Sequence, residues 1–544
     1  MTKPTDQTIL AHRAVMGRFL TTLLNEGLIK GSIEGARVKI PLANAPLWFT
    51  VDFNCLPIVE GNAVKMLDPD DIIFPLVHDD NEIDDIESLA FLIASHLNQD
   101  VSTVLKEMKS SVKTLIHAYS TMEPLPPMGS DAMAWEHSII EGHPTHPMNK
   151  SRSTNPPMAP ILPTQNLKTP TICMFALPTN QVTVRGDYLD HILPLAKGCP
   201  VFNPAEMVAI PVHELQVPMI SLHFPDAIDL GIRLHSEAQV SLRTVRLDQL
   251  PDFNLKLSLA ATVTSALRTI TPWTTYLSPG FNKLADAVIE DTSNLKVAHE
   301  LGSVIANHPD PDVQKHFSCI VRNEAQSLCP GETVIVCAAL TEKRHGKYIL
   351  PELFGLTSEA SRLAFFKTYV TLLISSFLPP IVKHGFSFEA HLQNTLARFD
   401  ANNNLVGFCV RDFGGIKAHA PTLLQSTGLE LDVWNKDAFQ NAGSLKDVYS
   451  VGYHTLVQMH LHRIVRALGF HYSRKGWEII HNLLDQHIPK EHPARDYFLN
   501  TPTALWKAFL SMKFDGLYRD YLYAPIPNLL LLQPTKSISP TVSR

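Results

Sequence analysis

The sequence lacks the short motifs that usually bind nucleotide phosphates or build a hydrolase site. Its 544 residues contain no G-x-x-x-x-G-K-[ST], no G-x-G-x-x-G, no G-x-S-x-G and no H-E-x-x-H. These absences exclude a standard phosphate cradle, a nucleophile elbow and a zinc-protease helix. Any phosphate that the protein binds must therefore be held by side-chain cations.

Positive charge and paired cysteines are also scarce. The formal net charge is -7, which argues against general binding to nucleic acids or membrane surfaces, because both attract proteins through a positive field. The seven cysteines are scattered and never form a C-x-x-C pair. We therefore expect reduced thiols that fill the core, with neither a disulfide framework nor a zinc knuckle.

The sequence shows no targeting or membrane-spanning segment. The first residues lack an apolar run followed by a small-residue cleavage site, and no later stretch approaches the length of a membrane span. Apolar residues make up 45% of the chain, which is typical of a globular protein with a sizeable core. We expect a cytoplasmic protein without a membrane or nucleic-acid partner, and a homodimer.

The length predicts about three or four domain-sized units, and the hydrophobic patterns divide the chain into three. Residues 1–135 form a mainly helical unit, with helices over 6–27 and 87–118. Residues 136–340 form a sheet-rich domain, for which the alternating patterns predict strands over 217–224, 238–247, 254–264 and 332–340. Residues 341–544 mix helices with antiparallel sheet, so the fold class is α+β.

Three details are predicted within the last unit. A helix over 358–378 should stop at Pro379 and Pro380, because proline removes a backbone donor and clashes with the preceding turn. A hairpin should follow, with its turn from Asp400 to Asn404. The tail after about residue 526 should be a loose arm.

A loop over residues 141–154, EGHPTHPMNKSRST, carries the first cluster of cations. Pro144 and Pro147 fix the backbone, and the cationic side chains suit a flap that places several donors on one anion; they are His143, His146, Lys150 and Arg152. Two alternatives remain open. One is that the His-x-x-His pair is half of a metal site, although no third ligand lies nearby in the sequence. The other is that the loop is an exposed basic segment without a role.

Two further clusters follow on predicted strands. Strand alternation places Ser241 and Arg243 on one face and Thr244 on the other. The next strand has its leucines on one face, and the opposite face forms a polar strip that ends at an arginine; the strip consists of Lys256, Ser258, Thr262, Thr264 and Arg268. This strip suits an anion, and the alternative is the solvated face of an ordinary antiparallel sheet.

The fourth cluster combines carboxylates with an amide. Glu389, His391 and Asn394 lie within two helical turns, and the predicted hairpin returns Asp412 to the same end of the sheet. Such groups beside a triphosphate are what Mg²⁺ requires, because this ion takes few protein ligands and completes its shell with phosphate and water. The alternatives are a turn-capping role for Asp412 and a structural, hydrogen-bonded role for His391.

Taken together, the motifs EGHPTHPMNKSR, SLRT, KLSLAATVTSALRT, HGFSFEAHLQN and RDFGG resemble the NRPS-independent siderophore synthetases of the IucA/IucC family, in order and separation. The resemblance runs from about residue 141 to 415. It implies a three-lobed thumb, fingers and palm architecture. It also implies an enzyme that uses ATP and Mg²⁺ to adenylate a carboxyl group of citrate or a related polycarboxylate, and that passes the acyl group to an amine or alcohol.

The resemblance also implies a role for each predicted site residue. The ATP ligands would be Ser241, Arg243, Thr244 and Lys256, with the loop residues His143, His146, Lys150 and Arg152 closing over the nucleotide. The carboxylate substrate would contact Thr264, Arg268, His391 and Asn394. Glu389 and Asp412 would carry Mg²⁺, and the catalytic groups would be Lys256, Arg268 and His391.

The sequence departs from the family pattern at two positions and leaves a third without an assignment. Thr154 replaces a glycine that usually follows the loop arginine, and Met459 replaces a polar residue before His460. Lys507 is a candidate for a further basic ligand, and an amphipathic helix explains it equally well.

A kinase-like phosphotransferase is the alternative function. Glu389, Asn394 and the D-F-G that begins at Asp412 imitate the spacing of a kinase catalytic loop and its metal aspartate. A kinase would also need a glycine-rich strand turn and a V-A-I-K lysine upstream, and the sequence shows neither. An inactive binding homologue is a third interpretation, which the nearly complete ligand set disfavours.

Overall fold

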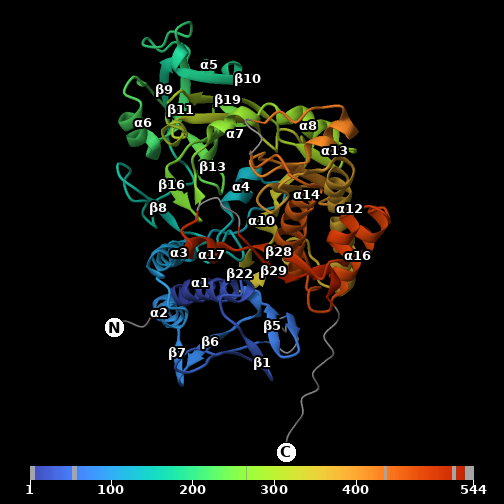
Figure 1. Ribbon diagram of the computed structural model, residues 1–544. Helices are drawn as coiled ribbons and strands as arrows, with labels where there is room; N and C mark the ends of the chain where they lie inside the picture. The colour runs from blue at the N-terminus through green and yellow to red at the C-terminus, as the bar shows by residue number, and fades with distance from the viewer. Residues whose placement is uncertain (1–5, 52–57, 265, 434–437, 518–521, 533–544) are drawn as a thin grey trace, which may run out of the picture.

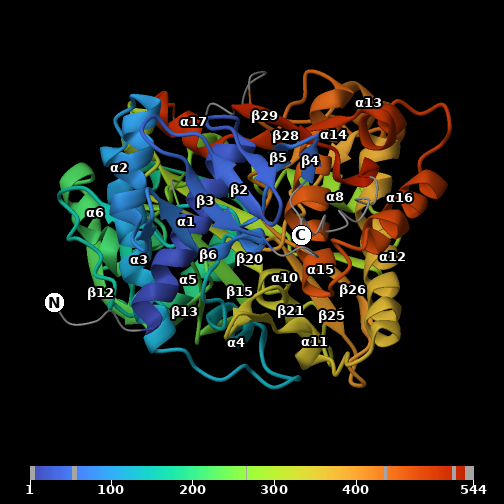
Figure 2. The same cartoon turned by 90° about the horizontal axis from the view of Figure 1, so that it is seen from below.

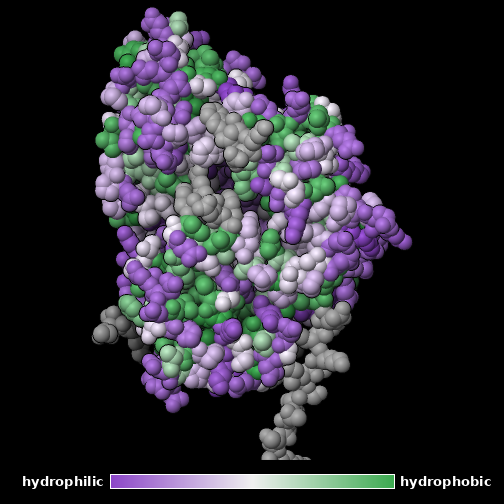
Figure 3. Space-filling view, in the orientation of Figure 1, coloured by the Kyte–Doolittle hydropathy of each residue, from purple (hydrophilic) through white to green (hydrophobic). Residues whose placement is uncertain are grey.

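The structure is a computed structural model that describes residues 6–51, 58–264, 266–433, 438–517 and 522–532. It combines helices and sheets throughout, as the α+β prediction requires. Figure 1 shows the N-terminal residues at the bottom, the strands of the middle of the chain at the top, and the C-terminal helices at one side. Polar and apolar side chains are interspersed on the face in Figure 3, which is hollowed between its upper and lower parts.

The N-terminal unit packs three helices on one sheet. The predicted helices are confirmed as α1 (Asp6–Asn25), α2 (Ile86–Leu97) and α3 (Ser102–Ser120). They lie side by side (Figure 2) between the sheet and the rest of the molecule (Figure 1). The antiparallel sheet has the order β4-β5-β1-β2-β3-β6-β7. Its strands are β1 (Ser32–Glu34), β2 (Arg37–Ile40), β3 (Leu47–Thr50), β4 (Ile58–Glu60), β5 (Ala63–Met66), β6 (Ile73–His78) and β7 (Asn81–Ile83).

Two antiparallel sheets build the middle of the chain. The larger has the order β10-β19-β20-β15-β14-β13 and the smaller β11-β9-β12. Their strands are β9 (Ile172–Pro178), β10 (Val182–Gly186), β11 (Met207–His213), β12 (Ile228–Leu234), β13 (Ser236–Ala238), β14 (Thr244–Leu247), β15 (Leu250–Leu257), β19 (Glu300–Ala306) and β20 (Ser318–Asn323). The helices here are α4 (Ala132–His137), α5 (Tyr188–Ala196), α6 (Val217–His223), α7 (Pro272–Leu277), α8 (Phe281–Val288) and α9 (Pro311–Gln314).

None of the four strands predicted in this part is correct over its whole length. The segment 238–247 is strand only at its two ends, in β13 and β14, and the segment 254–264 divides between β15 and β16 (Ala261–Val263), which belong to different sheets. Residues 217–223 form helix α6, in which Pro218 occupies the first turn, where its missing N–H costs nothing. The predicted strand over 332–340 divides into β21 (Thr333–Val336) and the short helix α10 (Cys337–Leu340). Both segments are apolar enough for either structure, so the pattern alone did not separate them.

A small third sheet joins the loop of residues 141–154 to the middle strands. Strand β8 (Arg152–Thr154) pairs with β16 (Ala261–Val263), which pairs with β17 (Ala266–Leu267). Arg152 lies opposite Val263 in this register. The end of the loop is therefore an edge strand of the same region that carries Thr264 and Arg268.

The C-terminal part places one long helix beside a four-stranded sheet. The sheet order is β18-β26-β25-β21, with β18 (Leu295–Val297) parallel to β26 and the other pairs antiparallel. Strands β25 (Thr395–Phe399) and β26 (Leu405–Val410) confirm the predicted hairpin. Two antiparallel sheets of two strands each pair β22 (Lys343–Arg344) with β23 (Lys347–Tyr348) and β24 (Phe386–Ser387) with β27 (Lys417–Ala418). The helices are α11 (Leu350–Leu353), α12 (Glu359–His384), α13 (Ala420–Thr427), α14 (Leu445–Gly452), α15 (His462–Ala467), α16 (Lys475–His487) and α17 (Phe509–Phe514), with a π-helix at Tyr453–Leu461.

The prediction that Pro379 and Pro380 stop the long helix is wrong. Helix α12 continues through both prolines to His384, where Gly385 ends it in the left-handed conformation. Phe377, Leu378 and Ile381 are buried around the prolines. Burial of this apolar face offsets the backbone hydrogen bonds that the two prolines cannot donate.

Helix α12 also corrects the expectation that no segment has the length of a membrane span. Its 26 residues are long and apolar enough to cross a membrane by length and composition, and 61% of its most apolar window is buried inside the protein. Leu373 and Ile374, in the middle of α12, are fully buried in the largest core cluster. The helix is the central core helix of this part of the fold.

The C-terminal segment is packed further than predicted. Strand β28 (Thr503–Lys507) pairs with β29 (Tyr523–Pro527), and Leu529 and Leu530 are buried. The loose arm predicted after residue 526 is therefore wrong as far as residue 532, and its remainder lies outside the described residues. Six cysteines are free thiols, as predicted, and five of these are buried. Cys55 lies outside the described residues.

A buried ionic joint connects the N-terminal unit to the C-terminal helices. Asp68 pairs with Arg463, and Arg466 Nη1 lies 2.9 Å from Asp71 Oδ1. Asp70 pairs with Lys343 in the same cluster. Burial raises the pKa of a carboxyl group, but the charges of Arg463 and Arg466 hold the pKa of Asp68 well below its usual range. The joint consists of Asp68, Asp70, Asp71, Lys343, Arg463 and Arg466.

Candidate active site

One cavity of about 1300 Å³ collects every residue that the sequence predicts for the site. Its lining comes from the second and third parts of the chain, from Glu136 to Tyr523. The fourteen predicted residues in its wall are His143, His146, Lys150, Arg152, Ser241, Arg243, Thr244, Lys256, Thr264, Arg268, Glu389, His391, Asn394 and Asp412. Ser258 and Thr262 of the predicted polar strip are not among the lining residues.

The loop of residues 141–154 is a fixed wall of this cavity. The carboxylate of Glu342 accepts hydrogen bonds at 3.1 Å from three successive backbone N–H groups, those of Ile140, Glu141 and Gly142. Glu141 also pairs with Arg18 of helix α1. These bonds tie the start of the loop to both the N-terminal and the C-terminal parts.

The second half of the loop is held by helix α3. Ser110 Oγ accepts from the backbone N–H of Arg152 and donates to its carbonyl oxygen, each at 3.1 Å. His146 is only 2% exposed. The alternative of an exposed basic segment is therefore wrong in its exposure, because six of the fourteen loop residues are buried and the other eight are half-buried.

The loop histidines present ring N–H groups in their neutral form. His143 Nδ1 accepts from the backbone N–H of His146 at 3.1 Å, and His146 Nδ1 accepts from Met148 at the same distance. Burial lowers the pKa of His146 to about 3 and holds that of His143 well below its usual range. Since Nδ1 is an acceptor in both rings, the proton is on Nε2.

Burial also lowers the basicity of the two loop cations. It lowers the pKa of Lys150 to about 8 and the pKa of Arg152 to about 10. Both side chains carry a desolvated positive charge in the cavity wall. A polyanionic ligand would restore the lost solvation, so these residues favour anion binding.

The next cations lie on or beside short strands: Arg243 directly precedes β14, Lys256 is on β15, and Arg268 directly follows β17. Thr244 pairs with Lys256 across the two strands, and the side chain of Arg243 donates to the carbonyl oxygens of Arg268 and Thr269 at 2.9 and 2.8 Å. Arg268 Nη2 donates to Val263 at 3.0 Å. These bonds hold both guanidinium groups along one wall. The prediction that one strand face carries the polar strip is wrong, because β15 ends at Leu257 and Thr264 follows β16.

The two predicted metal ligands meet at Gly414 and Gly415. The backbone N–H of Gly414 donates to Asp412 Oδ1 at 3.0 Å. A Cβ at Gly415 would lie 2.1 Å from Glu389 Oε2, so only glycine leaves room for this carboxylate. Asn394 Nδ2 donates to Glu389 Oε2 at 3.3 Å. Both carboxylates and the amide therefore belong to one corner of the cavity.

Asp412 is neutralised by Lys256. Lys256 Nζ lies 2.8 Å from Asp412 Oδ1 and 3.8 Å from Glu300 Oε1. Burial raises the pKa of Asp412, but the positive charges of Lys256 and Arg322 outweigh this effect and hold the pKa far below its usual range. Asp412 is thus a carboxylate at any physiological pH.

These groups fit Mg²⁺ better than a metal held by protein alone. Among the described residues, no group of three or more His, Cys, Asp or Glu side chains could hold a metal ion. Mg²⁺ needs only one or two carboxylates when phosphates and water complete its shell. The predicted alternative of a zinc-type site at the two loop histidines therefore receives no support from the residues that the structure describes.

Several cavity residues were missed by the sequence analysis. They come from the C-terminal part and include Gln440, His454, Phe509, Lys513 and Tyr523. Met459 and Lys507 also line the cavity, whereas His460 bonds Tyr369 and the carbonyl oxygen of Ala390 in the core. His454 and Met459 lie on the π-helix, which has no simple sequence signal and is frequent at functional sites.

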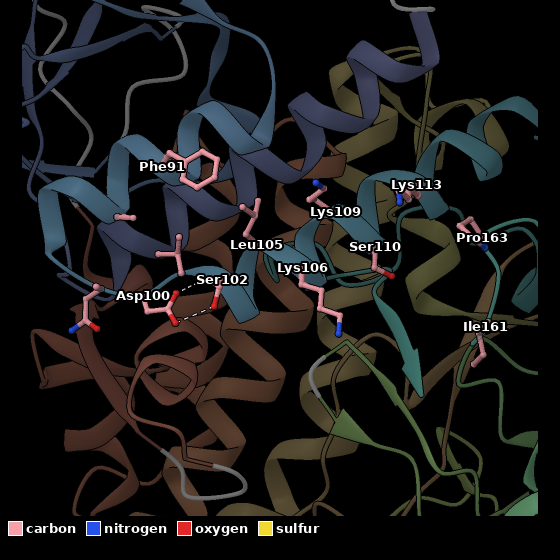
Figure 4. A pocket seen from close by; sticks show the side chains of 13 residues that line it. Phe91, Asp100, Ser102, Leu105, Lys106, Lys109, Ser110, Lys113, Ile161 and Pro163 are labelled. Atoms are coloured by element: carbon pink, nitrogen blue, oxygen red, sulfur yellow. Dashed lines mark hydrogen bonds between the residues drawn. The ribbon is translucent and has the colours of Figure 1, made fainter. Parts of the chain in front are cut away.

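A second hollow of about 660 Å³ lies beside helix α3, whose residues from Ser102 to Lys113 contribute to its lining. Figure 4 shows Phe91 and Leu105 on one side of it and Ile161 and Pro163 on the other. None of the fourteen predicted residues lines it. Ser110 connects it to the cavity, since this residue lines the hollow and binds the backbone of Arg152.

Comparison with known proteins identifies the family. The model of the IucA / IucC family matches residues 131–342, and the model described as ferric iron reductase FhuF-like transporter matches residues 363–514. The NRPS-independent siderophore synthetase rfs of Rhizopus delemar is 39% identical over 451 residues, which are 79% of this chain and 71% of the relative. The chain belongs to the IucA/IucC family of NRPS-independent siderophore synthetases.

Other members of the family agree in sequence and in fold. The D-ornithine--citrate ligase of Staphylococcus aureus is 22% identical over 73% of this synthetase and 69% of that protein. The petrobactin biosynthesis protein AsbB from Bacillus anthracis has the same fold, with a TM-score of 0.77, 19% identity and coverage of 97% and 96%. ATP-bound aerobactin synthetase IucA from Klebsiella pneumoniae gives a TM-score of 0.74 with 16% identity, and covers 96% of this chain and all of that one.

The family resemblance predicted from the motifs is thus confirmed, together with the mixed α+β fold. The relatives are named synthetases and ligases, so this protein has a ligase role in siderophore biosynthesis. The boundaries of the three units and the role of each site residue stay predictions.

Proposed function

We propose that this synthetase activates a carboxyl group of citrate or a related polycarboxylate as an acyl-adenylate. ATP supplies the adenylyl group, pyrophosphate leaves, and an amine or alcohol then takes the acyl group and releases AMP. One relative is named as a ligase of citrate and one neighbour in fold is ATP-bound, which supports both substrates. We also propose that the enzyme acts as a cytoplasmic homodimer.

The observation that carries the proposal is the charge of the 1300 Å³ cavity. Five lysine and arginine side chains of the predicted set line it, with two carboxylates that fit Mg²⁺; the five are Lys150, Arg152, Arg243, Lys256 and Arg268. A polycarboxylate and a triphosphate repel each other strongly at short range. Cations fixed in a desolvated wall offset this repulsion without having to reorganise during the reaction.

The nucleotide phosphates belong on strands β14 and β15. Arg243 and Lys256 would bind them, with Ser241 and Thr244 as neutral donors. Ser241 Oγ is buried in the cavity wall without a partner among the described residues, which supports this role. Lys150 and Arg152, with the N–H groups of His143 and His146, would face the same phosphates from the loop.

The carboxylate substrate belongs beside Arg268. Arg268 would form a forked pair with one carboxylate, and Thr264 and His391 would donate to its other oxygens. Asn394 borders this side of the cavity through its bond to Glu389. Glu389 and Asp412 would hold Mg²⁺, which when bound neutralises charge on the phosphates during displacement of pyrophosphate.

Arg268→Lys should raise the KM for the acid far more than the KM for ATP. Lysine keeps the charge but cannot copy the forked geometry. Loss of one charge-assisted hydrogen bond costs about 1.5–3 kcal/mol, which corresponds to about a 10- to 100-fold rise in KM. Steady-state kinetics with each substrate varied in turn measures both constants.

The matched control is Arg246→Lys. Arg246 is on β14 but pairs with Asp131 and Glu237 outside the cavity lining. This change should move neither KM. Equal increases in both KM values for Arg268→Lys would argue that the residue acts through the fold and not on the acid.

The nucleotide product tests the reaction class. The protein is incubated with ATP, Mg²⁺, citrate and a panel of diamines and amino alcohols, and the nucleotides are separated by chromatography. AMP and pyrophosphate that form only when the acid is present are the expected products. ADP as the only product would overturn adenylation and favour the kinase-like alternative, which would use the same Glu389, Asn394 and Asp412.

A further inference from the structure

Besides cations, carboxylates, hydroxyls and amides, the cavity contains histidine rings, and one of them, His454, differs from its neighbours in which nitrogen carries the proton. His454 lies on the π-helix and lines the cavity, and the residue is half-buried. Its Nδ1 lies 2.7 Å from Gln458 Oε1, one turn further along the same helix. An amide oxygen only accepts, so Nδ1 carries the proton, and the lone pair of the neutral ring is on Nε2.

The other histidines around the substrates have the opposite arrangement. His391 Nδ1 accepts from the backbone N–H groups of Gln393 and Asn394 at 3.2 and 3.3 Å, so its proton is on Nε2, 3.9 Å from Glu389 Oε1. His143 and His146 are fixed in the same way by backbone donors. These three rings therefore present N–H groups, which suit anions.

We propose that His454 is the general base that takes the proton from the acceptor when the acceptor attacks the acyl-adenylate. This inference rests on the proposed function and names the residue for its second step. The geometry is what assigns it, because His454 offers a lone pair to the cavity where the neighbouring histidines offer protons. The π-helix supports the assignment, since it presents His454 and Met459 together on the cavity wall.

The step balances without any further reactant. The acceptor nitrogen or oxygen forms a bond to the acyl carbon, and the bond from that carbon to the phosphate oxygen of AMP breaks with its electron pair on the oxygen. The proton of the attacking group moves to His454 Nε2 and later to solvent. Gln458 holds Nδ1–H throughout and stabilises the imidazolium that forms.

The charges around His454 favour proton uptake only when substrates are present. His143, His391 and Lys507 face it from the loop, from the segment after β24 and from β28, while Glu389 lies close to Lys507. Burial, with Lys507 and His391, lowers the pKa of His454 to about 4, so the ring is neutral before the reaction. Bound polyanions reverse this field and raise its proton affinity during acyl transfer.

His137 is the one other cavity histidine with an available lone pair among the described residues. Its Nε2 lies 3.0 Å from the carbonyl oxygen of Ala238 and donates to it, which leaves the lone pair on Nδ1. Its charged neighbours are Lys168, Glu237 and Glu136, beside the strands assigned to the nucleotide. It serves as the matched control for His454.

The test separates the two half-reactions in the full-length protein. His454→Gln is compared with the unchanged protein in citrate-dependent ATP–pyrophosphate exchange, in hydroxamate formation with hydroxylamine, and in amide formation with the best amine of the panel. Hydroxylamine is unprotonated at neutral pH and attacks without a base. We expect exchange and hydroxamate formation to persist, while amide formation falls about 10²- to 10⁴-fold and is partly restored by added imidazole.

Two results would overturn the proposal. A parallel fall in all three activities would make His454 a structural or substrate-binding residue, and unchanged amide formation would remove any role as a base. His137→Gln should not separate amide from hydroxamate formation, and the same separation in this control would also count against the assignment. Absence of exchange in the unchanged protein would instead refute the proposed function itself, which is a different result.

Discussion

Asp412→Asn should abolish most turnover while leaving the binding of ATP intact. We expect kcat to fall about 10²- to 10³-fold, and excess Mg²⁺ to restore little of it. The affinity for ATP measured by calorimetry in the presence of a chelator should be equal or higher. The substitution removes one negative charge from the corner where phosphates and metal are proposed to meet.

Asparagine is the right substitution at this position because the backbone is unusual. Asp412 has a φ of +72°, in the left-handed region where asparagine is among the few residues other than glycine that are comfortable. Its side-chain oxygen can still accept from Gly414. The change therefore isolates the charge from the shape, and a loss of activity reports on metal and phosphate chemistry.

The matched control is Asp400→Asn in the turn of the same hairpin. Asp400 is half-buried, and its carboxylate accepts from the backbone N–H groups of Asn402 and Asn404 in its own turn. Its turnover should stay close to that of the unchanged protein. Near-normal kcat for Asp412→Asn, or a loss that high Mg²⁺ fully repairs, would contradict the proposed role.

Asp68→Asn should destabilise the attachment of the N-terminal unit by about 3–5 kcal/mol. The change keeps the side-chain oxygen that accepts from the backbone N–H of Asp70, but it leaves the Arg463 guanidinium buried without its carboxylate. Differential scanning calorimetry should show a lower unfolding temperature. Because the pKa of Asp68 is depressed in the folded protein, its stabilisation is present above its unfolded pKa and is lost as the pH falls toward the folded value.

The difference in unfolding temperature between Asp68→Asn and the unchanged protein should therefore become smaller as the pH is lowered. Glu359→Gln is the control, because Glu359 pairs with Lys475 at an exposed site where both side chains are more than half accessible to solvent. It should leave the unfolding temperature unchanged at every pH. An equal effect of the two substitutions would mean that the joint contributes no more than a surface pair.

The long, periodic helices, the hairpin and the fourteen site residues could be predicted from the sequence. Helices α1 to α3 and the hairpin at Asp400 were predictable because each has a strong local signal. The fourteen site residues were predictable only through their joint resemblance to one family. Their meeting in one cavity is a property of the fold, since they come from β-strands, a loop and a hairpin far apart in the chain.

The missed elements lacked a local signal or had a misleading one. The N-terminal sheet consists of strands of three to six residues, too short for alternation to stand out. Pro379 and Pro380 predicted a helix end, but tertiary packing of α12 overrode the local cost. His454 lies in a stretch whose pattern predicts an ordinary buried helix, and the i→i+5 hydrogen bonding of a π-helix cannot be predicted from the sequence.

Through its bonds to the loop over residues 141–154, the N-terminal unit supports one wall of the proposed active site. Helix α1 holds Glu141, helix α3 holds Arg152, and Glu342 holds the backbone between the two units. A chimaera that exchanged the N-terminal unit for that of a relative would have to bring matching partners for Glu141 and Arg152. Substitutions that adapt the enzyme to new acids or acceptors can therefore occur in the C-terminal wall of the cavity. Substitutions in the N-terminal unit and in the loop would have to occur together.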